Sequence, residues 1–317
     1  MRVAILDDYL NVALELGDWS SLHGKAELFV FDKPFASQDE AAEKLAKFEI
    51  IVGMRERTAF SSNLLKRLPN LKLLITTGMR NRSFDMEAAT EQGITICGTD
   101  SAGQPTAELT WAILLGLACQ IPAHDRGMKS GQWQTKLNGN VGGKTLGVVG
   151  LGKLGSAVAR VGLAFGMKVI AWSQNLTDER AAEVGAIRVE KKTLLSQSDY
   201  ISIHLILSDR SRGLIGAEEL KQMKPSAYLV NTSRGPIVDE DALLEALQNH
   251  KIAGAGIDVY SEEPLPVGSP FRTLDNVLLT PHMGYVATNN ISRMYSDAAE
   301  DIAAFLDGNP VRVLNNN

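Results

Sequence analysis

The stretch TLGVVGLGKLGSAVA, from Thr145 to Ala159, decides the fold. It begins as an apolar run typical of a buried strand and continues into a helical pattern, and Gly150, Gly152 and Gly155 have the spacing GxGxxG. Gly150 permits a tight turn, Gly152 lets the backbone approach a pyrophosphate, and Gly155 lets the helix pack on the strand without an intervening Cβ. The amides of the helix N-terminus would then hold the phosphates. This setting predicts a dinucleotide-binding domain, although a glycine-rich turn without a ligand is the alternative.

The next apolar run, KVIAW at 168–172, ends without the acidic residue that usually holds the ribose of NAD about 20 residues after such a loop. Ser173 occupies that position and is followed by Gln174 and Asn175. A carboxylate would accept the ribose hydroxyls and repel a 2′-phosphate, whereas Ser173 removes the repulsion and can donate to phosphate oxygens. Arg180, the nearest arginine, is expected on the following helix. The sequence therefore favours NADP(H), with NAD(H) as the second possibility.

Apolar, β-rich runs alternate with helical patterns along most of the chain, which predicts parallel α/β sheets. The expected strands lie at 2–6, 27–31, 49–53, 71–76 and 94–98, and then at 145–150, 168–172, 200–205, 227–232, 253–260 and 276–281. The clearest expected helices lie at 37–48, 84–93 and 287–306, and a further long helix begins at Pro105, which suits a first helical turn. The polar, glycine-rich stretch at 124–144 is predicted to be a surface excursion or a contact segment. Two α/β units are therefore expected.

Composition and charge argue against several classes of function. The net charge is −5 and no basic run occurs, so neither nucleic acid nor an acidic membrane surface is an expected partner. The apolar run WAILLGLACQI at 111–121 is too short to span a membrane. Cys97 and Cys119 form no CxxC pair, which indicates buried thiols and no metal site. The first residues lack a signal-peptide pattern, so a cytoplasmic location is expected.

Three strand ends in the second unit carry groups suited to redox chemistry. NTSRGP, DVYSEEP and TPHMG each follow an apolar run and contain Arg234, Glu263 and His282 respectively. Because ligands bind at the carboxyl ends of parallel strands, these side chains could converge beside the dinucleotide. Arg234 can bind a carboxylate and polarise a carbonyl, His282 can transfer a proton, and Glu263 can orient the imidazole. The set suits hydride transfer to a 2-oxo acid, although each residue alone is more often structural or a surface charge.

Together these motifs resemble the D-isomer-specific 2-hydroxyacid dehydrogenase family, which includes the glyoxylate/hydroxypyruvate reductases. The resemblance rests on GKTLGVVGLGKLGSAVA at 143–159, YISIHLILSDRSRGLIG at 200–216, MKPSAYLVNTSRGPIVDEDAL at 223–243, GAGIDVYSEEP at 254–264 and LLTPHMG at 278–284. TTGMRNRSFDMEAATEQGI at 76–94 matches more loosely. The resemblance implies NAD(P)H-dependent reduction of a small 2-oxo acid, such as glyoxylate or hydroxypyruvate, to the D-2-hydroxy acid. It makes His282 the acid/base, Glu263 its partner and Arg234 the substrate-binding cation.

The resemblance also implies two doubly wound parallel-sheet α/β domains. A discontinuous, flavodoxin-like substrate domain would comprise residues 1–99 plus 285–317, and a Rossmann cofactor domain would comprise residues 100–284, with a cleft that closes over the substrate. Members of the family are homodimers, so a homodimer through the cofactor domain, with 105–143 in the interface, is implied. The implied cofactor-binding positions are Thr106, Gly150, Gly152, Lys153, Leu154, Gly155, Ser173, Gln174, Leu205, Thr232, Asp258 and Gly284, with Asp258 at the nicotinamide carboxamide. The implied substrate-binding positions are Met79 and Arg80, through their amides, together with Arg55 and Arg234.

Some positions depart from the family pattern. Ile206 stands where the family usually has a proline, and the substrate loop reads GMRNRS instead of a small, glycine-rich sequence. Arg55 and Arg57 are extra cations that would either select a substrate with a second polar or anionic group or be solvated surface. Two alternative functions stay open, namely D-3-phosphoglycerate dehydrogenase and a non-enzymatic, NAD(H)-sensing protein resembling the family's corepressor relatives. Formate oxidation is not expected, because the formate enzymes of the family carry Gln in place of Glu263.

Overall fold

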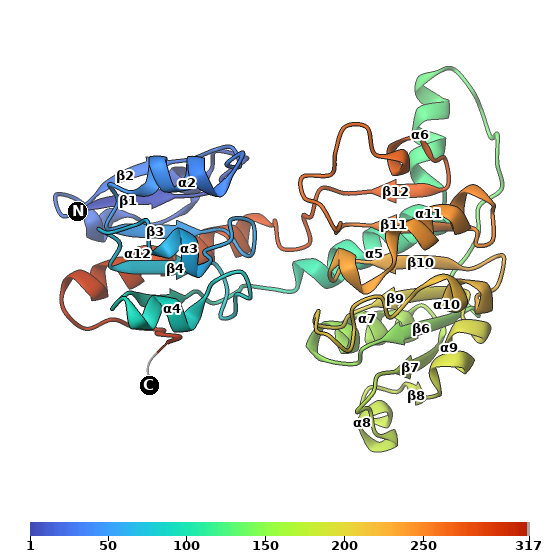
Figure 1. Ribbon diagram of the computed structural model, residues 1–317. Coiled ribbons are helices and arrows are strands. Elements are labelled where there is room, and N and C mark those ends of the chain that lie inside the picture. Colours follow the sequence, from blue (N-terminus) through green and yellow to red (C-terminus); the bar gives the residue numbers. More distant parts are fainter. Residues whose placement is uncertain (316–317) are drawn as a thin grey trace. The chain divides into compact units, whose positions relative to one another are not determined.

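The computed structural model describes residues 1–315 and divides into two compact units (Figure 1). Unit 1 consists of Met1–Gly103 and the C-terminal segment from Val286, and unit 2 is Gln104–Tyr285. The boundaries between the units therefore fall at 103/104 and 285/286, where the sequence predicted 99/100 and 284/285.

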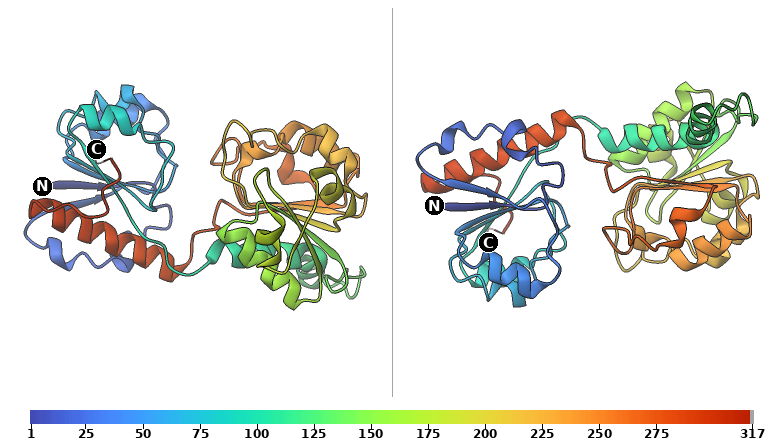
Figure 2. Two further views of the ribbon diagram at one scale, coloured as in Figure 1. Left: turned by 90° about the horizontal axis from the view of Figure 1, so that it is seen from below. Right: turned by 90° about the horizontal axis from the view of Figure 1, so that it is seen from above.

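Unit 1 is built on a five-stranded parallel sheet with the order β2-β1-β3-β4-β5, which is the flavodoxin-like order. Its strands are β1 Arg2–Ile5, β2 Glu27–Val30, β3 Ile50–Gly53, β4 Leu73–Thr76 and β5 Thr95–Gly98. Its helices are α1 Ala13–Leu16, α2 Gln38–Leu45, α3 Ser62–Leu65, α4 Met86–Glu91 and α12 Thr288–Leu306, with a 3-10 turn, η1, at Ser20–Leu22. Figure 2 shows α12 and α1 on one face of the sheet and α2, α3 and α4 on the other. The predicted doubly wound α/β fold is confirmed for this unit.

Unit 2 contains a seven-stranded parallel sheet with the order β12-β11-β10-β9-β6-β7-β8. Its strands are β6 Thr145–Val149, β7 Lys168–Trp172, β8 Ile187–Arg188, β9 Tyr200–Ile203, β10 Tyr228–Asn231, β11 Gly254–Ile257 and β12 Val277–Leu279. Its helices are α5 Pro105–Ala118, α6 Ile121–Lys129, α7 Lys153–Ala164, α8 Asp178–Ala182, α9 Lys191–Gln197, α10 Ala217–Gln222 and α11 Glu240–Gln248, with 3-10 turns η2 Gly235–Ile237 and η3 Pro270–Thr273. After β6, the strands β7 and β8 are added on one side of it, and β9 to β12 are then added on the other side. This change of side between β6 and β9 is the switch point of the predicted Rossmann topology.

Two elements of unit 2 were not predicted. Strand β8 has only two residues, both exposed, so it leaves no apolar run in the sequence. Helix α6 overlaps the stretch at 124–144 that was predicted to be a surface excursion, because Ile121 and Pro122 start a helical turn that continues to Lys129. The residues after α6, at 130–140, are exposed and carry no regular structure, as that prediction expected.

The sheets are buried on both faces, which explains why the strands read as continuous apolar runs. All four residues of β3, β4, β9 and β11 are buried. The glycine pattern of β11 has a packing cause, because a Cβ on Gly256 would lie 2.1 Å from Cγ2 of Ile113 on α5. The missing side chain therefore lets α5 lie directly against the strand whose carboxyl end carries Asp258.

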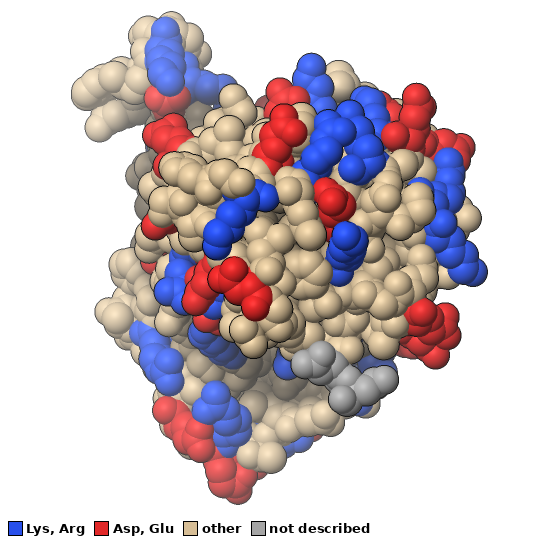
Figure 3. All heavy atoms as spheres, turned by 90° about the vertical axis from the view of Figure 1, so that its left-hand side faces the viewer, with Lys and Arg blue, Asp and Glu red and all other residues tan. Residues whose placement is uncertain are grey.

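Three chemical features of the described residues concern the cysteine thiols, the possible metal ligands and the surface charge. Cys97 is buried, Cys119 is half-buried and both thiols are free. Among residues 1–315, no three His, Cys, Asp or Glu side chains are grouped as a metal site would require. Lys and Arg side chains are interspersed with Asp and Glu on the face that Figure 3 shows.

No single helix in the described part of the chain is long and apolar enough to cross a membrane. Within residues 1–315, α5 and α6 together are long and apolar enough, but the pair bends by 62° at the break between the two helices.

Candidate active site

The glycine loop of unit 2 adopts the conformation that its sequence predicted. Gly150 follows β6 with a φ of +98°, a region that favours glycine, and its amide donates to the carbonyl oxygen of Trp172 at 2.8 Å. A Cβ on Gly155 would lie 1.9 Å from the carbonyl oxygen of Gly150, so a side chain there is excluded. A Cβ on Gly152, in contrast, would meet no atom within 4 Å, so the backbone at Gly152 is open to approach.

The start of α7 fits an anionic group. Gly152 is the N-cap and supplies no side-chain hydrogen bond to the first amides, and the first turn of this 12-residue helix contains no acidic residue. The orphan amides and the positive end of the helix dipole are therefore directed at the open space beside Gly152. The pyrophosphate of a dinucleotide fits this chemistry, and the backbone of Gly152, Lys153 and Leu154 would hold it.

Three neighbouring strands place two predicted catalytic residues and the predicted cofactor-binding residue Asp258 at one edge of the unit 2 sheet. β10, β11 and β12 lie side by side, and their carboxyl ends lead to Arg234, Asp258 and His282 (Figure 1). Glu263 lies on the loop that follows β11. Strand β6, with its glycine loop, ends at the same edge because all these strands are parallel.

His282 and Glu263 form a direct pair. The imidazole Nδ1 lies 2.5 Å from Oε2 of Glu263, and the two side chains are 20% and 28% exposed. The other oxygen, Oε1, accepts the amide of Tyr260 at 2.8 Å, which fixes the carboxylate. Since an ionised carboxylate only accepts hydrogen bonds, Nδ1 must carry the proton of the pair and Nε2 is the ring nitrogen left for proton exchange.

Electrostatics keep Glu263 ionised. Burial acts to raise the pKa of Glu263, but the hydrogen bond and charge of His282, the Tyr260 amide and the charge of Arg234 together hold this pKa below its usual range. Arg234 therefore belongs to the same electrostatic cluster as the pair. Its guanidinium Nη1 donates to the carbonyl oxygen of Ser233 at 2.7 Å, and its own carbonyl oxygen accepts from Asn231 Nδ2 at 3.0 Å.

Asp258 holds the loop that carries His282. Its Oδ1 accepts from Thr280 Oγ1 at 2.6 Å and from the Met283 amide at 2.9 Å, and its Oδ2 accepts from the Gly284 amide at 2.9 Å. The carboxylate is fully buried, and this burial raises its pKa although the hydrogen bonds oppose the effect. These bonds brace the left-handed backbone of His282, which has a φ of +50°. The sequence marked Asp258 but gave no sign of this bracing role.

Tyr285 is a neighbour of His282 that sequence reasoning missed. The two rings meet edge to face at 84°, with centroids 5.8 Å apart. A tyrosine three residues after the histidine is the only sequence signal of this contact.

The remaining cofactor positions of the sequence prediction are spread along the same unit. Thr106 Oγ1 donates to the carbonyl oxygen of Gly284 at 2.7 Å, and Thr232 is buried with its hydroxyl 2.8 Å from that of Thr110. Leu205 packs beside Gly150, since its Cδ2 would lie 2.8 Å from a Cβ there. At the end of β7, Ser173 is half-buried and Gln174 is exposed.

Unit 1 holds the other substrate-binding positions of the sequence prediction. Met79 and Arg80 are exposed on the loop after β4, and Arg55 is half-buried after β3 with its Nη1 donating to the carbonyl oxygen of Thr77 at 2.8 Å. These residues lie at the carboxyl edge of the unit 1 sheet.

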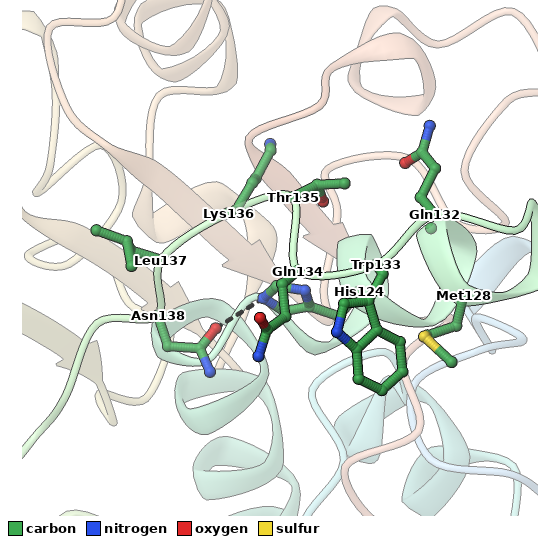
Figure 4. Close-up of a pocket in the computed structure, with 10 residues that line it drawn as sticks. His124, Met128, Gln132, Trp133, Gln134, Thr135, Lys136, Leu137 and Asn138 are labelled. Atoms are coloured by element: carbon green, nitrogen blue, oxygen red, sulfur yellow. Dashed lines mark hydrogen bonds between the residues drawn. The ribbon is translucent and has the colours of Figure 1, made fainter.

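A hollow of about 660 Å³ lies apart from the predicted site residues, on α6 and the segment after it (Figure 4). His124 and Asn138 close one side through a 2.7 Å hydrogen bond. Trp133 and Leu137 line the hollow and are 74% and 92% exposed. The hollow therefore belongs to the predicted contact segment.

Comparisons with known proteins agree with this geometry. Residues 111–284 match the family model described as "D-isomer specific 2-hydroxyacid dehydrogenase, NAD binding domain". A glyoxylate reductase of Aeropyrum pernix is 40% identical over 256 residues, which cover 78% of this chain and 76% of that protein. A D-3-phosphoglycerate dehydrogenase of Archaeoglobus fulgidus is 36% identical over 87% of this chain, which spans only 53% of that longer protein. Among solved structures, a phosphoglycerate oxidoreductase from Vibrio cholerae has a TM-score of 0.92 and 35% identity, with 97% of this chain and 99% of that chain covered.

The pairing of Glu263 with His282 predicts a pH-dependent contribution to stability. Because the folded pKa of Glu263 lies below its ordinary value of 4.5, the contribution is present above that value and is lost as the pH falls through the folded pKa. Glu263→Gln should therefore lower the free energy of unfolding by roughly 1–3 kcal/mol near neutral pH, and by less in acid. Thermal unfolding across pH 3–7 measures the difference between wild type and variant.

The matched control is Glu262→Gln, which removes an exposed neighbouring carboxylate and should behave like the wild type. A gap between wild type and Glu263→Gln that stays constant over the whole pH range would contradict the ionised pair.

Proposed function

The chain belongs to the D-isomer-specific 2-hydroxyacid dehydrogenase family, a family of NAD-dependent oxidoreductases, and on this premise we propose that it reduces a small 2-oxo acid to the D-2-hydroxy acid. Glyoxylate or hydroxypyruvate is the proposed type of substrate. The observation that carries the proposal is the His282–Glu263 pair, with Arg234 in its electrostatic cluster, at the sheet edge where the glycine loop also ends.

The proposed chemistry divides among these residues. When bound, the nicotinamide supplies the hydride that reduces the carbonyl carbon of the substrate. His282 gives the proton on Nε2 to the carbonyl oxygen, while ionised Glu263 on Nδ1 stabilises the imidazolium before transfer and keeps the ring aligned. Arg234 binds the substrate carboxylate and stabilises the charge that develops on the carbonyl oxygen.

The relatives support more than one substrate. The similarity to a glyoxylate reductase favours a 2-oxo acid whose carbonyl carbon carries only a hydrogen or a small, uncharged group. The similarity to phosphoglycerate enzymes and the arginines after β3 favour oxidation of D-3-phosphoglycerate as a second candidate. Steady-state assays with glyoxylate, hydroxypyruvate, pyruvate and 3-phosphohydroxypyruvate distinguish the two. An absence of turnover with every 2-oxo acid would contradict both.

The role of His282 predicts a selective loss of turnover. His282→Ala should lower kcat by about 10²- to 10⁴-fold, because general acid–base catalysis contributes about that much. Binding of the reduced cofactor, measured by nicotinamide fluorescence, should stay within about threefold of wild type, because the variant leaves the glycine loop and the amides that would hold the pyrophosphate unchanged.

The control for this variant is His23→Ala, an exposed histidine of unit 1. If His282→Ala kept near-normal kcat while His23→Ala did the same, His282 would not be the acid/base.

We further propose that NADPH is preferred over NADH. At the end of β7 the half-buried Ser173 leaves no carboxylate to repel a 2′-phosphate, and its neighbour Gln174 is exposed. Arg180, the nearest arginine, lies on α8 and is paired with Glu183. The proposal therefore rests on the lost repulsion rather than on a dedicated cation.

This account predicts that kcat/KM is higher with NADPH and that Ser173→Asp reverses the preference toward NADH by about tenfold or more. Paired assays of wild type and variant with both cofactors measure it. A wild-type preference for NADH of tenfold or more would contradict the proposal.

We also propose a homodimer formed through the segment from α6 to residue 140. Four large apolar side chains are exposed on it: Ile121, Met128, Trp133 and Leu137. Such a concentration of exposed apolar surface is typical of a protein interface, and a second copy of the chain is the proposed occupant.

The dimer predicts a molar mass in solution of twice that of the chain, measured by light scattering after size-exclusion chromatography. Leu137→Asp should shift the mass toward the monomer, because it places a charge on an interface side chain that is 92% exposed in the single chain. Val267→Asp, at an equally exposed valine outside the segment, is the control and should remain dimeric. A monomeric wild type would contradict the proposal.

A further inference from the structure

The segment that follows α12 covers the edge of the unit 1 sheet. Strand β5 is the last strand in the order of that sheet. Residues 311–315, which we call the strap, lie antiparallel beside it: Gly98 donates its amide to the carbonyl oxygen of Arg312 at 3.0 Å, and the Leu314 amide donates to that of Ile96 at 2.8 Å. The strap therefore takes up hydrogen bonds that an edge strand otherwise offers to another chain.

One arginine ties the strap to α12. Arg312 Nε donates to Oδ1 of Asp301 at 3.0 Å, and its Nη2 lies 2.9 Å from the same oxygen. Nη2 also donates to the carbonyl oxygen of Asp297 at 2.9 Å and lies 2.8 Å from Oε2 of Glu300. Arg312 has a left-handed backbone with a φ of +50°, which residues other than glycine rarely adopt. Its guanidinium therefore connects a strained strap to one turn of the helix.

Asp301 is the acceptor whose hydrogen bonds are incomplete. Its side chain is 0% exposed, and no donor among residues 1–315 lies within hydrogen-bonding distance of its Oδ2. An ionised carboxylate is disfavoured in such a place, because one oxygen loses its hydration without gaining a donor. Burial accordingly raises the pKa of Asp301 to about 7, although the charge and hydrogen bond of Arg312 oppose this, and the charges of Asp297 and Glu300 raise it further.

The other ionisable groups near Asp301 leave its Oδ2 without a donor. On α12, Asp297 is itself engaged, since Arg293 Nε lies 2.8 Å from its Oδ1 and the Asp100 amide donates to its Oδ2 at 2.9 Å. On β5 the facing group is the thiol of Cys97, whose pKa is raised by burial and by the charge of Asp301. Strand β4 also contacts α12, and its four residues carry no ionisable side chain. The remaining ionisable groups on elements that contact α12 lie on α1 and around η1, and they are Glu15, Asp18, His23 and Lys25.

From this arrangement we infer that the strap is a pH-sensitive latch, closed while Asp301 carries a proton on Oδ2 and loosened when that proton is lost. The inference concerns unit 1 alone and does not depend on the proposed function. Once the proton is lost, the two arginines of the cluster face three carboxylates of α12, one of which lacks a donor. Opening of the strap lets water reach Asp301 and uncovers the edge of β5 for pairing with another strand.

The direction of the pH dependence follows from the position of this proton. The closed strap holds the proton up to a pH of about 7, whereas Asp301 in an open strap releases it near its ordinary pKa of 3.8. The proton therefore stabilises the closed strap fully below 3.8, and this stabilisation is lost as the pH rises through about 7. The ratio of open to closed strap should rise about tenfold per pH unit from pH 5 toward pH 7 and level off above it.

The thiol of Cys97 reports opening of the strap, because Cys97 pairs with Val313 and is buried. The test uses the full-length chain with Cys119→Ser, so that Cys97 is the thiol that reacts. The rate of its labelling by 4,4′-dithiodipyridine, divided by the rate for free cysteine at the same pH, measures the open fraction. This normalised rate should follow the predicted rise and plateau between pH 5 and pH 8.5.

Asp301→Asn removes the proton-binding group and should make the normalised rate independent of pH. The matched control is Asp307→Asn, at an exposed aspartate just after the same helix, which should keep the wild-type profile. A cysteine in the central strand, Ile51→Cys combined with Cys97→Ala, reports unfolding of the whole unit and should be labelled at least tenfold more slowly than Cys97.

The profile of the protein with its native Asp301 tests the inference even if Asp301→Asn does not fold. A normalised rate for Cys97 that stays constant between pH 5 and pH 7, or a rise that persists in Asp301→Asn, would overturn the inference. Equal labelling of Cys97 and of the cysteine at position 51 would also overturn it, because the strap would then open only when the whole unit unfolds.

Discussion

The parallel alignment of β6, β9, β10, β11 and β12 in one sheet is the constraint on which the rest of unit 2 depends. It sends the carboxyl ends of these strands to one edge, so groups that are more than a hundred residues apart in the sequence share one environment. The glycine loop, Arg234, Asp258 and His282 are all products of that pairing. Strand order alone does not align a proton donor, however, and the alignment comes from two carboxylates. Glu263 orients the ring of His282 from Nδ1, and Asp258 fixes the loop by accepting two backbone amides and the hydroxyl of Thr280.

The two units use a buried aspartate in similar ways. Asp258 in unit 2 and Asp7 in unit 1 each lie just beyond a strand end, and burial raises the pKa of each. Each carboxylate accepts a threonine hydroxyl from a neighbouring loop, Thr280 in one unit and Thr58 in the other. In each unit the buried aspartate fixes the loop beside it: the loop that carries His282 in unit 2, and the loop that carries Thr58 in unit 1.

The features that the sequence predicted correctly are those that follow from apolar runs and from the spacing of glycines. The fully buried strands appear as apolar runs, and the glycines at 150, 152 and 155 have the geometry that their spacing required. The two-residue β8 was missed because neither residue is buried, and α6 was missed because its glycine and charged residues resemble a loop. The bracing role of Asp258, the contact of the Tyr285 ring with His282 and the contact of the Arg57 guanidinium with the Tyr9 ring could not be predicted. Each depends on which loops the sheet brings together, and periodicity does not record that.

The most direct test of the central claim is the stereochemistry of the product made by the purified protein. We predict that incubation of a prochiral 2-oxo acid, such as hydroxypyruvate or 2-oxoglutarate, with reduced cofactor gives the D-2-hydroxy acid only, as resolved by chiral chromatography. We also predict that Arg234→Ala abolishes its formation at concentrations of substrate that saturate the wild type. Formation of the L-isomer, a racemic product, or undiminished D-product from the Arg234 variant would contradict the account.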